Sequence, residues 1–189
     1  MLKQIISFAH ELILQAVEPG ETIIDATCGN GHDTVVLSKA VGVNGQVLAF
    51  DIQKQALRNT KQLLDKQDIR NVTLIHASHE NIRFYLHEED HGTLSGAIFN
   101  LGYLPGSDKS VITNANSTIK AMDTIVDFLK PGGLIVLVVY HGHPGGDEEK
   151  ESLLKYLRTF NQKHFNVLKY GFINQKNHPP FILAVEKKK

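Results

Sequence analysis

Close to its N-terminus the chain reads Ile23-Ile24-Asp25-Ala26-Thr27-Cys28-Gly29-Asn30-Gly31-His32-Asp33-Thr34. This pattern is typical of a buried strand that enters a tight turn and continues as a helix. Gly29 and Gly31 let the backbone turn sharply and approach a ligand where a Cβ would clash. Asp51 stands twenty residues beyond Gly31, at the end of the next apolar run. A carboxylate there can accept hydrogen bonds from both hydroxyls of a ribose, so the segment predicts a site for a nucleoside-containing ligand.

Short apolar runs alternate with helical patterns along the rest of the chain. The runs cover residues 22–25, 47–51, 72–75, 97–100 and 134–139, and the helical patterns cover 32–40, 53–67, 78–88 and 114–129. Such alternation is typical of βαβ units around a parallel sheet. An amphipathic helix over 5–16 leads the chain, and a helix near 147–160 precedes strands at 165–172 and 181–185. Because the last connection is too short for a parallel crossover, these strands should be antiparallel neighbours in an α/β fold.

Composition limits the class of protein. A length of 189 residues suits a single domain over 1–189. No apolar run approaches the roughly 20 residues that cross a bilayer, and the single cysteine, Cys28, fits a reducing, cytosolic compartment. Twenty basic and twenty acidic residues balance, so a nucleic-acid substrate would have to be engaged locally rather than through a broad positive surface.

Two residues after the turn indicate which kind of nucleoside ligand the site favours. A dinucleotide fold needs Gly or Ala three positions after Gly31, where this chain has Thr34 preceded by Asp33. The carboxylate of Asp33 would repel a pyrophosphate but would attract the amino group of a methionine moiety. Asp25 adds a second carboxylate before the turn, so the pattern favours S-adenosylmethionine over a nicotinamide dinucleotide.

The fourth predicted strand ends at Asn100 and continues as Leu101-Gly102-Tyr103. Ligands of open α/β sheets bind beyond the carboxyl ends of the strands, so Asn100 and Tyr103 should face the reactive end of the cofactor. The Asn100 side-chain oxygen and the Leu101 carbonyl can accept the hydrogens of an amine and so aim its lone pair. Tyr103 can stack on a base or donate a hydrogen bond. A strand-ending asparagine and an aromatic loop anchor are the alternative interpretation.

Histidines follow the fifth predicted strand. His141-x-His143 has the spacing of a metal pair, but no third ligand has convincing spacing, so we expect no metal site. A neutral His141 could instead accept a proton from the incoming amine. Asn177-His178-Pro179-Pro180 could be a pocket wall or turn chemistry alone.

The motif Asp25-x-Thr27-x-Gly29-x-Gly31 resembles the first motif of class I methyltransferases, with Thr27 in place of a glycine. The resemblance implies a Rossmann-like, seven-stranded, mostly parallel sheet with a C-terminal antiparallel hairpin, and S-adenosylmethionine as cofactor. It implies that Gly29, Asn30 and Gly31 line the methionine end. It also places Asp51 at the ribose, Gln53 on the adenine side, and Ser78 and His79 near the base.

The stretches 25–34, 100–108 and 140–146 resemble a compact bacterial family labelled putative rRNA methylases, whose members include tRNA wobble-uridine methyltransferases. This resemblance implies methylation of 5-aminomethyl-2-thiouridine at position 34 of tRNA, giving the 5-methylaminomethyl form. The partner would then be the anticodon region of tRNA. Methylation of rRNA or of a small-molecule amine, and a non-catalytic cofactor-binding module, are the alternatives.

Two further expectations concern surfaces. One is that four cations converge around the pocket mouth to grip tRNA: Lys109, Lys120, Arg158 and Lys163. The other is that an exposed sheet edge or the N-terminal helix could mediate a homodimer.

Overall fold

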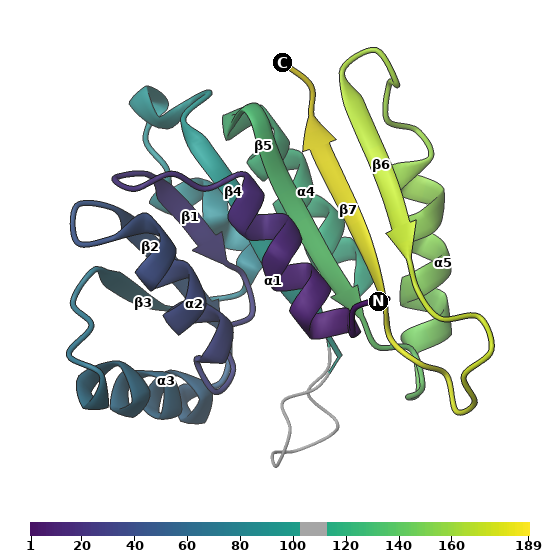
Figure 1. The fold of residues 1–189 in the computed structure, drawn as a ribbon, viewed down its shortest axis with the longest axis horizontal. Coiled ribbons are helices and arrows are strands. Elements are labelled where there is room, and N and C mark those ends of the chain that lie inside the picture. Colours follow the sequence, from purple (N-terminus) through teal and green to yellow (C-terminus); the bar gives the residue numbers. More distant parts are fainter. Residues whose placement is uncertain (103–112) are drawn as a thin grey trace.

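The computed structural model describes residues 1–102 and 113–189. Its centre is a seven-stranded sheet in the order β3-β2-β1-β4-β5-β7-β6 (Figure 1). The strands are β1 (Thr22–Asp25), β2 (Gln46–Asp51), β3 (Val72–His76), β4 (Leu94–Leu101), β5 (Leu129–Val139), β6 (Phe165–Tyr170) and β7 (Phe181–Lys187). The helices are α1 (Ile5–Gln15), α2 (His32–Val41), α3 (Lys54–Lys66), α4 (Ala115–Phe128) and α5 (Gly146–Leu157).

The first five strands in the chain pair in parallel, and the last two reverse direction. In β1, Ile24 pairs with Leu48 of β2 on one side and with Ala97 of β4 on the other. β7 runs antiparallel to both β5 and β6, with Ala184 opposite Val136. The expected mostly parallel sheet with an antiparallel C-terminal hairpin is therefore confirmed.

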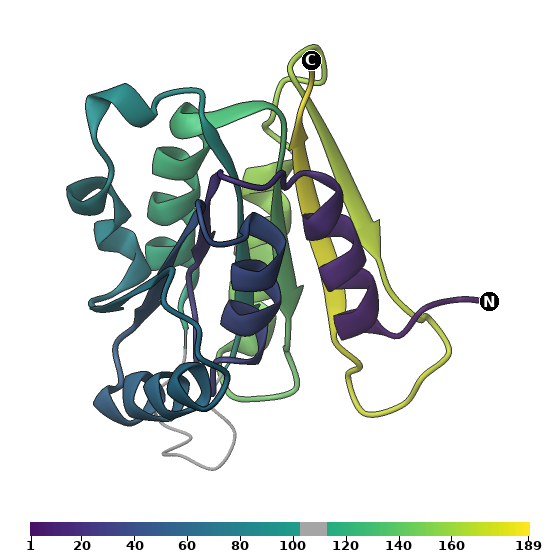
Figure 2. The same ribbon diagram turned by 60° about the vertical axis from the view of Figure 1, so that its left-hand side comes forward.

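Two separate cores cover the two faces of the sheet. Successive side chains of a strand point to opposite faces, so Ile23 belongs to the core beneath α1 and α2, whereas Ile24 belongs to the core beneath α4 and α5. Figures 1 and 2 show these helices as layers on either side of the sheet. The near-continuous apolar runs of the sequence reflect strands that are buried on both faces.

Two segments differ from the expected pattern. Residues 78–88 do not form an α-helix, because the chain makes a 3₁₀ helix over His79–Tyr85 and a second short one over Glu88–Asp90. β5 begins at Leu129, well before the apolar run at 134–139, and includes Pro131, Gly132 and Gly133. Its pairing with β4 shifts register between Leu94 and Gly96, so an irregular first part of β5 continues directly from α4.

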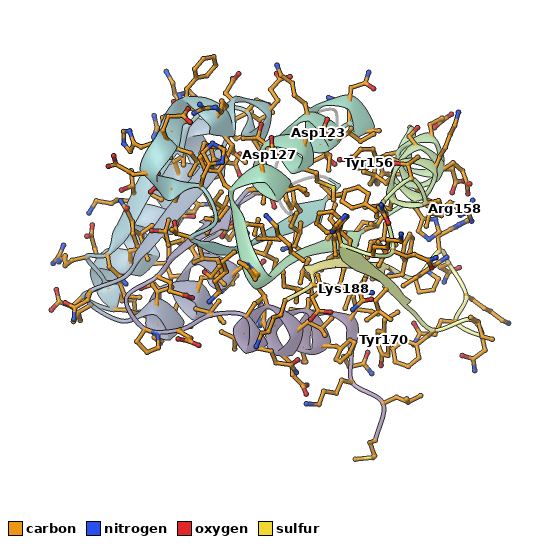
Figure 3. The ribbon with its side chains drawn as sticks, turned by 90° about the horizontal axis from the view of Figure 1, so that it is seen from above. Asp123, Asp127, Tyr156, Arg158, Tyr170 and Lys188 are labelled. Atoms are coloured by element: carbon orange, nitrogen blue, oxygen red, sulfur yellow. The ribbon has the colours of Figure 1, made fainter. Side chains whose placement is uncertain are left out.

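Helix α1 lies against the C-terminal part of the sheet. Its buried residues belong to the same core as Val136 of β5 and Ala184 of β7. The Tyr170 hydroxyl of β6 donates a hydrogen bond to the Lys3 carbonyl over 2.8 Å, and the rings of Phe8 and Tyr170 lie 4.3 Å apart. Figure 3 shows Tyr170 beside this helix. No helix in the described ranges is long and apolar enough to cross a membrane.

Candidate functional site

A cavity of about 510 Å³ opens at the carboxyl ends of β1, β2 and β4. Ligands of open α/β sheets bind at this edge. Nine of the residues singled out in the sequence line it, namely Thr27, Gly29, Asn30, Asp33, Asp51, Gln53, Ser78, His79 and Asn100. Residues from three separate strands thus meet at one site.

Asp51 ties the glycine turn to the end of β2. Its carboxylate accepts hydrogen bonds from the backbone N–H of Gly29 over 3.0 Å and of Gln53 over 2.9 Å. Burial raises the pKa of Asp51, and these backbone donors oppose the rise. The carboxylate has about four acceptor positions, so it can also accept hydrogen bonds from a ligand hydroxyl.

Gly31 is not among the residues that line the cavity. It precedes α2 with φ of +85°, in the left-handed region. A Cβ added there would lie 3.0 Å from the Thr60 Cα and from its side chain on α3. The Thr60 hydroxyl also donates to the Gly29 carbonyl over 3.0 Å. Gly31 is therefore required for the turn and for the close approach of α3, a contact invisible in the local sequence.

Asp25 lies beneath the turn rather than in the cavity wall. It is fully buried, accepts a hydrogen bond from the Thr34 hydroxyl over 2.6 Å, and accepts another from the Thr27 N–H over 3.3 Å. Burial, followed by the neighbouring Asp33 carboxylate, raises the pKa of Asp25 to about 7. Its role in this structure is to hold the strand, the turn and the helix together.

Asp33 links the N-terminal helix to the end of β4. One carboxylate oxygen lies 2.6 Å from Nε2 of His10 on α1, and the other accepts a hydrogen bond from Nδ2 of Asn100. A carboxylate only accepts, so Asn100 must present its amide nitrogen to Asp33. The Asn100 backbone N–H donates to the Thr27 hydroxyl over 2.7 Å, which fixes this residue from a second side. His10 was not singled out in the sequence, because only the fold brings it to Asp33.

The cavity wall formed by the residues that follow β2 and β3 combines apolar and polar surface. Ile52 follows Asp51 and is 51% exposed, and Ala77 lies nearby on the same wall. His79 is buried with Nδ1 3.3 Å from the Ala26 carbonyl, and burial lowers its pKa. A neutral His79 then donates from Nδ1 to that carbonyl and has an acceptor at Nε2. This wall suits a flat heteroaromatic group.

The opposite wall comes from the start of α4, which the sequence did not assign to the site, and from the residues that follow β5. Asn114 caps α4 by accepting a hydrogen bond from the Ser117 N–H over 3.0 Å, and both residues line the cavity. Tyr140 follows β5 and lines it too, with its pKa raised by burial and then by Asp33. An asparagine before a helix is a readable capping signal, but nothing local placed it at this site.

Only some of the residues predicted to bind the methyl acceptor line the cavity. Asn100 and Leu101 line the cavity, although the Leu101 carbonyl already accepts the Tyr140 N–H over 3.1 Å. Tyr103 lies outside the described residues. His141 is not in the cavity lining, because its Nε2 lies 3.2 Å from the Pro179 carbonyl and its Nδ1 lies 3.3 Å from Asp147. Its expected contact with the incoming amine therefore has no support from this geometry.

Cys28 behaves as a packing residue. It is 4% exposed, and burial raises the pKa of its thiol above the ordinary range. A thiol held protonated in this way is a poor nucleophile.

The expected cluster of four cations at the pocket mouth is wrong. Arg158 follows the end of α5, and Lys163 precedes Phe165, which pairs with Lys187 at the far end of β7. The cavity end of β7 is Phe181, which pairs with Val139. Arg158 and Lys163 thus lie at the opposite edge of the sheet, and Figure 3 labels Arg158 at the end of α5.

The other two members of that cluster are Lys120 and Lys109. Lys120 lies 3.8 Å from Glu80 in an ion pair, and Lys109 is outside the described residues. On the cavity side, Lys54 follows directly after Gln53, which lines the cavity.

Comparisons with known proteins agree with this architecture. A family model described as "Putative rRNA methylase" matches residues 47–186, and one described as "Protein-L-isoaspartate(D-aspartate) O-methyltransferase" matches residues 3–81. Among curated proteins, the "tRNA (mnm(5)s(2)U34)-methyltransferase, chloroplastic" of Arabidopsis thaliana is 43% identical over 158 residues, covering 79% of this chain and 57% of that protein. The chain spans about half the length of the curated relatives it matches.

Solved structures match over nearly the whole chain. A putative rRNA methylase from Clostridium thermocellum has a TM-score of 0.94 at 40% identity, and a putative methyltransferase from Streptococcus mutans in complex with SAH has a TM-score of 0.89 at 40% identity. Both alignments cover 99% of each chain. With the sheet order, the glycine turn and the family match in agreement, this chain belongs to the putative rRNA methylase family of methyltransferase-fold proteins.

Proposed function

We propose that this protein transfers a methyl group from S-adenosylmethionine to the 5-aminomethyl group of 5-aminomethyl-2-thiouridine at the wobble position of tRNA. The observation that carries the proposal is the orientation of Asn100 at the cavity wall. Asp33 holds the nitrogen of its amide, so the amide oxygen is the end that an amine can use. The name of the 43% identical Arabidopsis protein supports tRNA as the substrate class.

The residues present fit S-adenosylmethionine. A cavity of about 510 Å³ lies in the range of small-molecule sites. Asp51 would hold the ribose hydroxyls, Ile52 and Ala77 would cover the adenine, and Asn30 with Asp33 would face the amino acid end. The SAH bound to the Streptococcus mutans protein supports the same ligand class. When bound, the cofactor supplies an electrophilic methyl group.

The chain's own contribution to the reaction is positioning. Methyl transfer requires an unprotonated amine whose lone pair is aligned with the bond that breaks, and alignment alone can contribute several kcal/mol. Asn100 can accept one hydrogen of the amine through Oδ1 and so turn the lone pair toward the cofactor. Asp33, fixed by His10 and Asn100, places a negative charge beside the cationic groups of the reactants.

The anticodon region would approach the cavity mouth, where Lys54 is exposed next to Gln53. We infer that a flipped base enters the cavity while Lys54 contacts a neighbouring phosphate, a local contact that a chain of zero net charge can still provide. A cytosolic location and a homodimer through α1, where Leu14 is 38% exposed, complete the proposal. Light scattering on the purified protein measures the dimer, and a monomer at all concentrations would contradict it.

The decisive experiment incubates purified protein and labelled S-adenosylmethionine with tRNA from cells that lack the final wobble modification. Mass spectrometry of the nucleosides should find label on 5-aminomethyl-2-thiouridine. Asn100→Ala should lose turnover while binding SAH normally, and Asn166→Ala, at an exposed position of β6 away from the cavity lining, should retain both. Label on rRNA alone, or turnover by Asn100→Ala equal to the unaltered protein, would overturn the proposal.

A further inference from the structure

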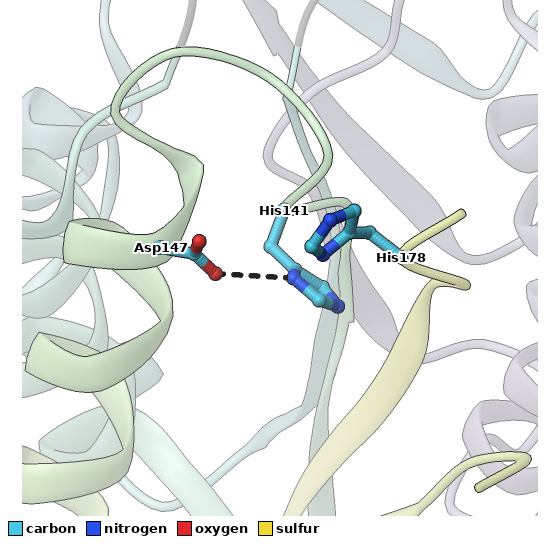
Figure 4. Close-up of side chains that lie close together, drawn as sticks. All are labelled: His141, Asp147 and His178. Atoms are coloured by element: carbon cyan, nitrogen blue, oxygen red, sulfur yellow. Dashed lines mark hydrogen bonds and ion pairs between the residues drawn. The ribbon is translucent and has the colours of Figure 1, made fainter. Parts of the chain in front are cut away.

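His141, Asp147 and His178 come together outside the cavity, although the sequence paired His141 with His143. One ligand atom from each of the three residues lies within 4.8 Å of the others. His141 follows β5, Asp147 lies in the first turn of α5, and His178 lies in the connection between β6 and β7 (Figure 4). Three segments far apart in the chain thus place two imidazoles and a carboxylate at one point.

The hydrogen bonds of His141 are compatible with a bound cation. Its Nε2 faces the Pro179 carbonyl at 3.2 Å, and a carbonyl only accepts, so Nε2 carries a hydrogen. In the neutral ring Nδ1 then presents a lone pair, yet it faces a carboxylate oxygen of Asp147 at 3.3 Å. Either Nδ1 also carries a hydrogen and the imidazolium donates to Asp147, or a cation lies between the two acceptors. Metal-ligating histidines commonly donate their other ring nitrogen to a backbone carbonyl, as His141 does.

The geometry is close to that of a small transition metal. Zn²⁺ binds nitrogen and oxygen at about 2.0–2.1 Å, which places tetrahedral ligands roughly 3.3 Å apart. The separation of His141 Nδ1 and Asp147 Oδ1 already equals 3.3 Å. The ligand atom of His178 lies within 4.8 Å of the other two, so it needs a shift of up to about 1.5 Å to reach that spacing, and it lies on an exposed connection. Both Asn177 and His178 have positive φ, of 64° and 52°, a conformation that Asn and His adopt more readily than most other non-glycine residues.

Asp147 also has an ordinary structural role. Its Oδ1 lies 2.7 Å from the Lys150 ammonium, and an acidic residue in the first turn stabilises a helix without any ligand. That role accounts for Asp147, and the two imidazoles also make an edge-to-face contact with their ring centroids 5.4 Å apart. Glu148, exposed in the same turn, provides the matched comparison.

From this convergence we propose that His141, Asp147 and His178 bind a divalent transition metal ion of the Zn²⁺ class, with water completing the coordination. The ion joins the β6–β7 connection to the start of α5. In the loop after β5, a Cβ added at Gly142 would lie 3.3 Å from the His178 Cβ, so this loop closely approaches the β6–β7 connection. The proposal concerns binding and stability and does not depend on methyl transfer.

The test uses full-length protein without an affinity tag, stripped with EDTA, and titrates Zn²⁺ by calorimetry. One ion should bind per chain, and His178→Ala and Asp147→Asn should each weaken binding at least tenfold. Glu148→Gln removes the same charge from the same turn, and His164→Gln removes an exposed imidazole elsewhere; both should bind like the unaltered protein. Zn²⁺ at a hundredfold excess over Kd should raise Tm by roughly 5–10 °C, with no rise in His178→Ala.

A second probe checks the coordination itself. Co²⁺ bound by the unaltered protein should show the visible absorption of a tetrahedral site, and His178→Ala should abolish it. Absence of saturable Zn²⁺ binding in the unaltered protein would overturn the proposal. So would equal binding by His178→Ala and Asp147→Asn, because the ion would then reside elsewhere.

Discussion

Replacing Asp25 by asparagine tests how the glycine turn is held. Asp25 is fully buried, and its pKa rises from 3.8 to about 7. In the unfolded chain the carboxyl ionises near its ordinary pKa, whereas the folded protein keeps the proton until about pH 7. The native state therefore loses stability as pH rises between these two values, and the full cost is present above the folded pKa.

The magnitude follows from the shift. Each pKa unit corresponds to about 1.4 kcal/mol, so ionising Asp25 costs the native state at most about 4 kcal/mol. Between pH 5 and 8 the cost should grow by roughly 2–3 kcal/mol. Asparagine matches the shape, accepts from the Thr27 N–H and can donate to the Thr34 hydroxyl, so Asp25→Asn should escape this pH dependence.

Urea denaturation followed by circular dichroism measures the effect. The stability of Asp25→Asn relative to the unaltered protein should rise by roughly 2–3 kcal/mol across that pH range. Asp127→Asn, at an exposed position of α4, should show no such trend. Parallel stability curves for Asp25→Asn and the unaltered protein would refute the reasoning.

Three other changes probe the turn, the ribose contact and the tRNA surface. Gly31→Ala should destabilise the protein by about 1–3 kcal/mol in urea denaturation, because a positive φ and the 3.0 Å approach to Thr60 both oppose a Cβ. An unchanged midpoint would contradict that packing argument. Asp51→Asn should weaken SAH binding roughly tenfold or more in calorimetry, since a hydrogen bond to a charged group contributes about 1.5–3 kcal/mol. Unaltered affinity would remove Asp51 from the ribose site. Lys54→Glu should weaken tRNA binding severalfold in a filter assay and leave SAH affinity unchanged, whereas Arg158→Glu, at the opposite edge, should alter neither. Equal loss in both variants would indicate a general charge effect.

The sequence predicted the features that depend on neighbouring residues. The run from Ile23 to Thr34 predicted the strand, the glycine turn and the following helix, because each of these leaves a local sequence pattern. The spacing to Asp51 predicted where β2 ends. The antiparallel pairing of β6 and β7 followed from the short connection between them.

Long-range contacts could not be predicted in the same way. His10 pairs with Asp33, and Thr60 packs on Gly31, only after α1 and α3 have docked. The prediction of a cation cluster was wrong because charge alone does not show chain direction. The direction of α5 and β6 places Arg158 and Lys163 at the edge of the sheet opposite the cavity. The sequence also did not predict the convergence of His141, Asp147 and His178, because only the fold brings helix α5 and the β6–β7 connection together.

The docking of α1 has a consequence for synthesis on the ribosome. The helix emerges before the strands that it packs against, because the surface that it covers is completed by β5 and β7, the last of which begins at Phe181. Until that strand has left the exit tunnel, the apolar side of α1 lacks its partner, and His10 is not held near Asp33. Domains generally fold as units during translation. A nascent chain stalled before residue 181 should therefore expose this helix to chaperones and proteases and bind no nucleoside ligand.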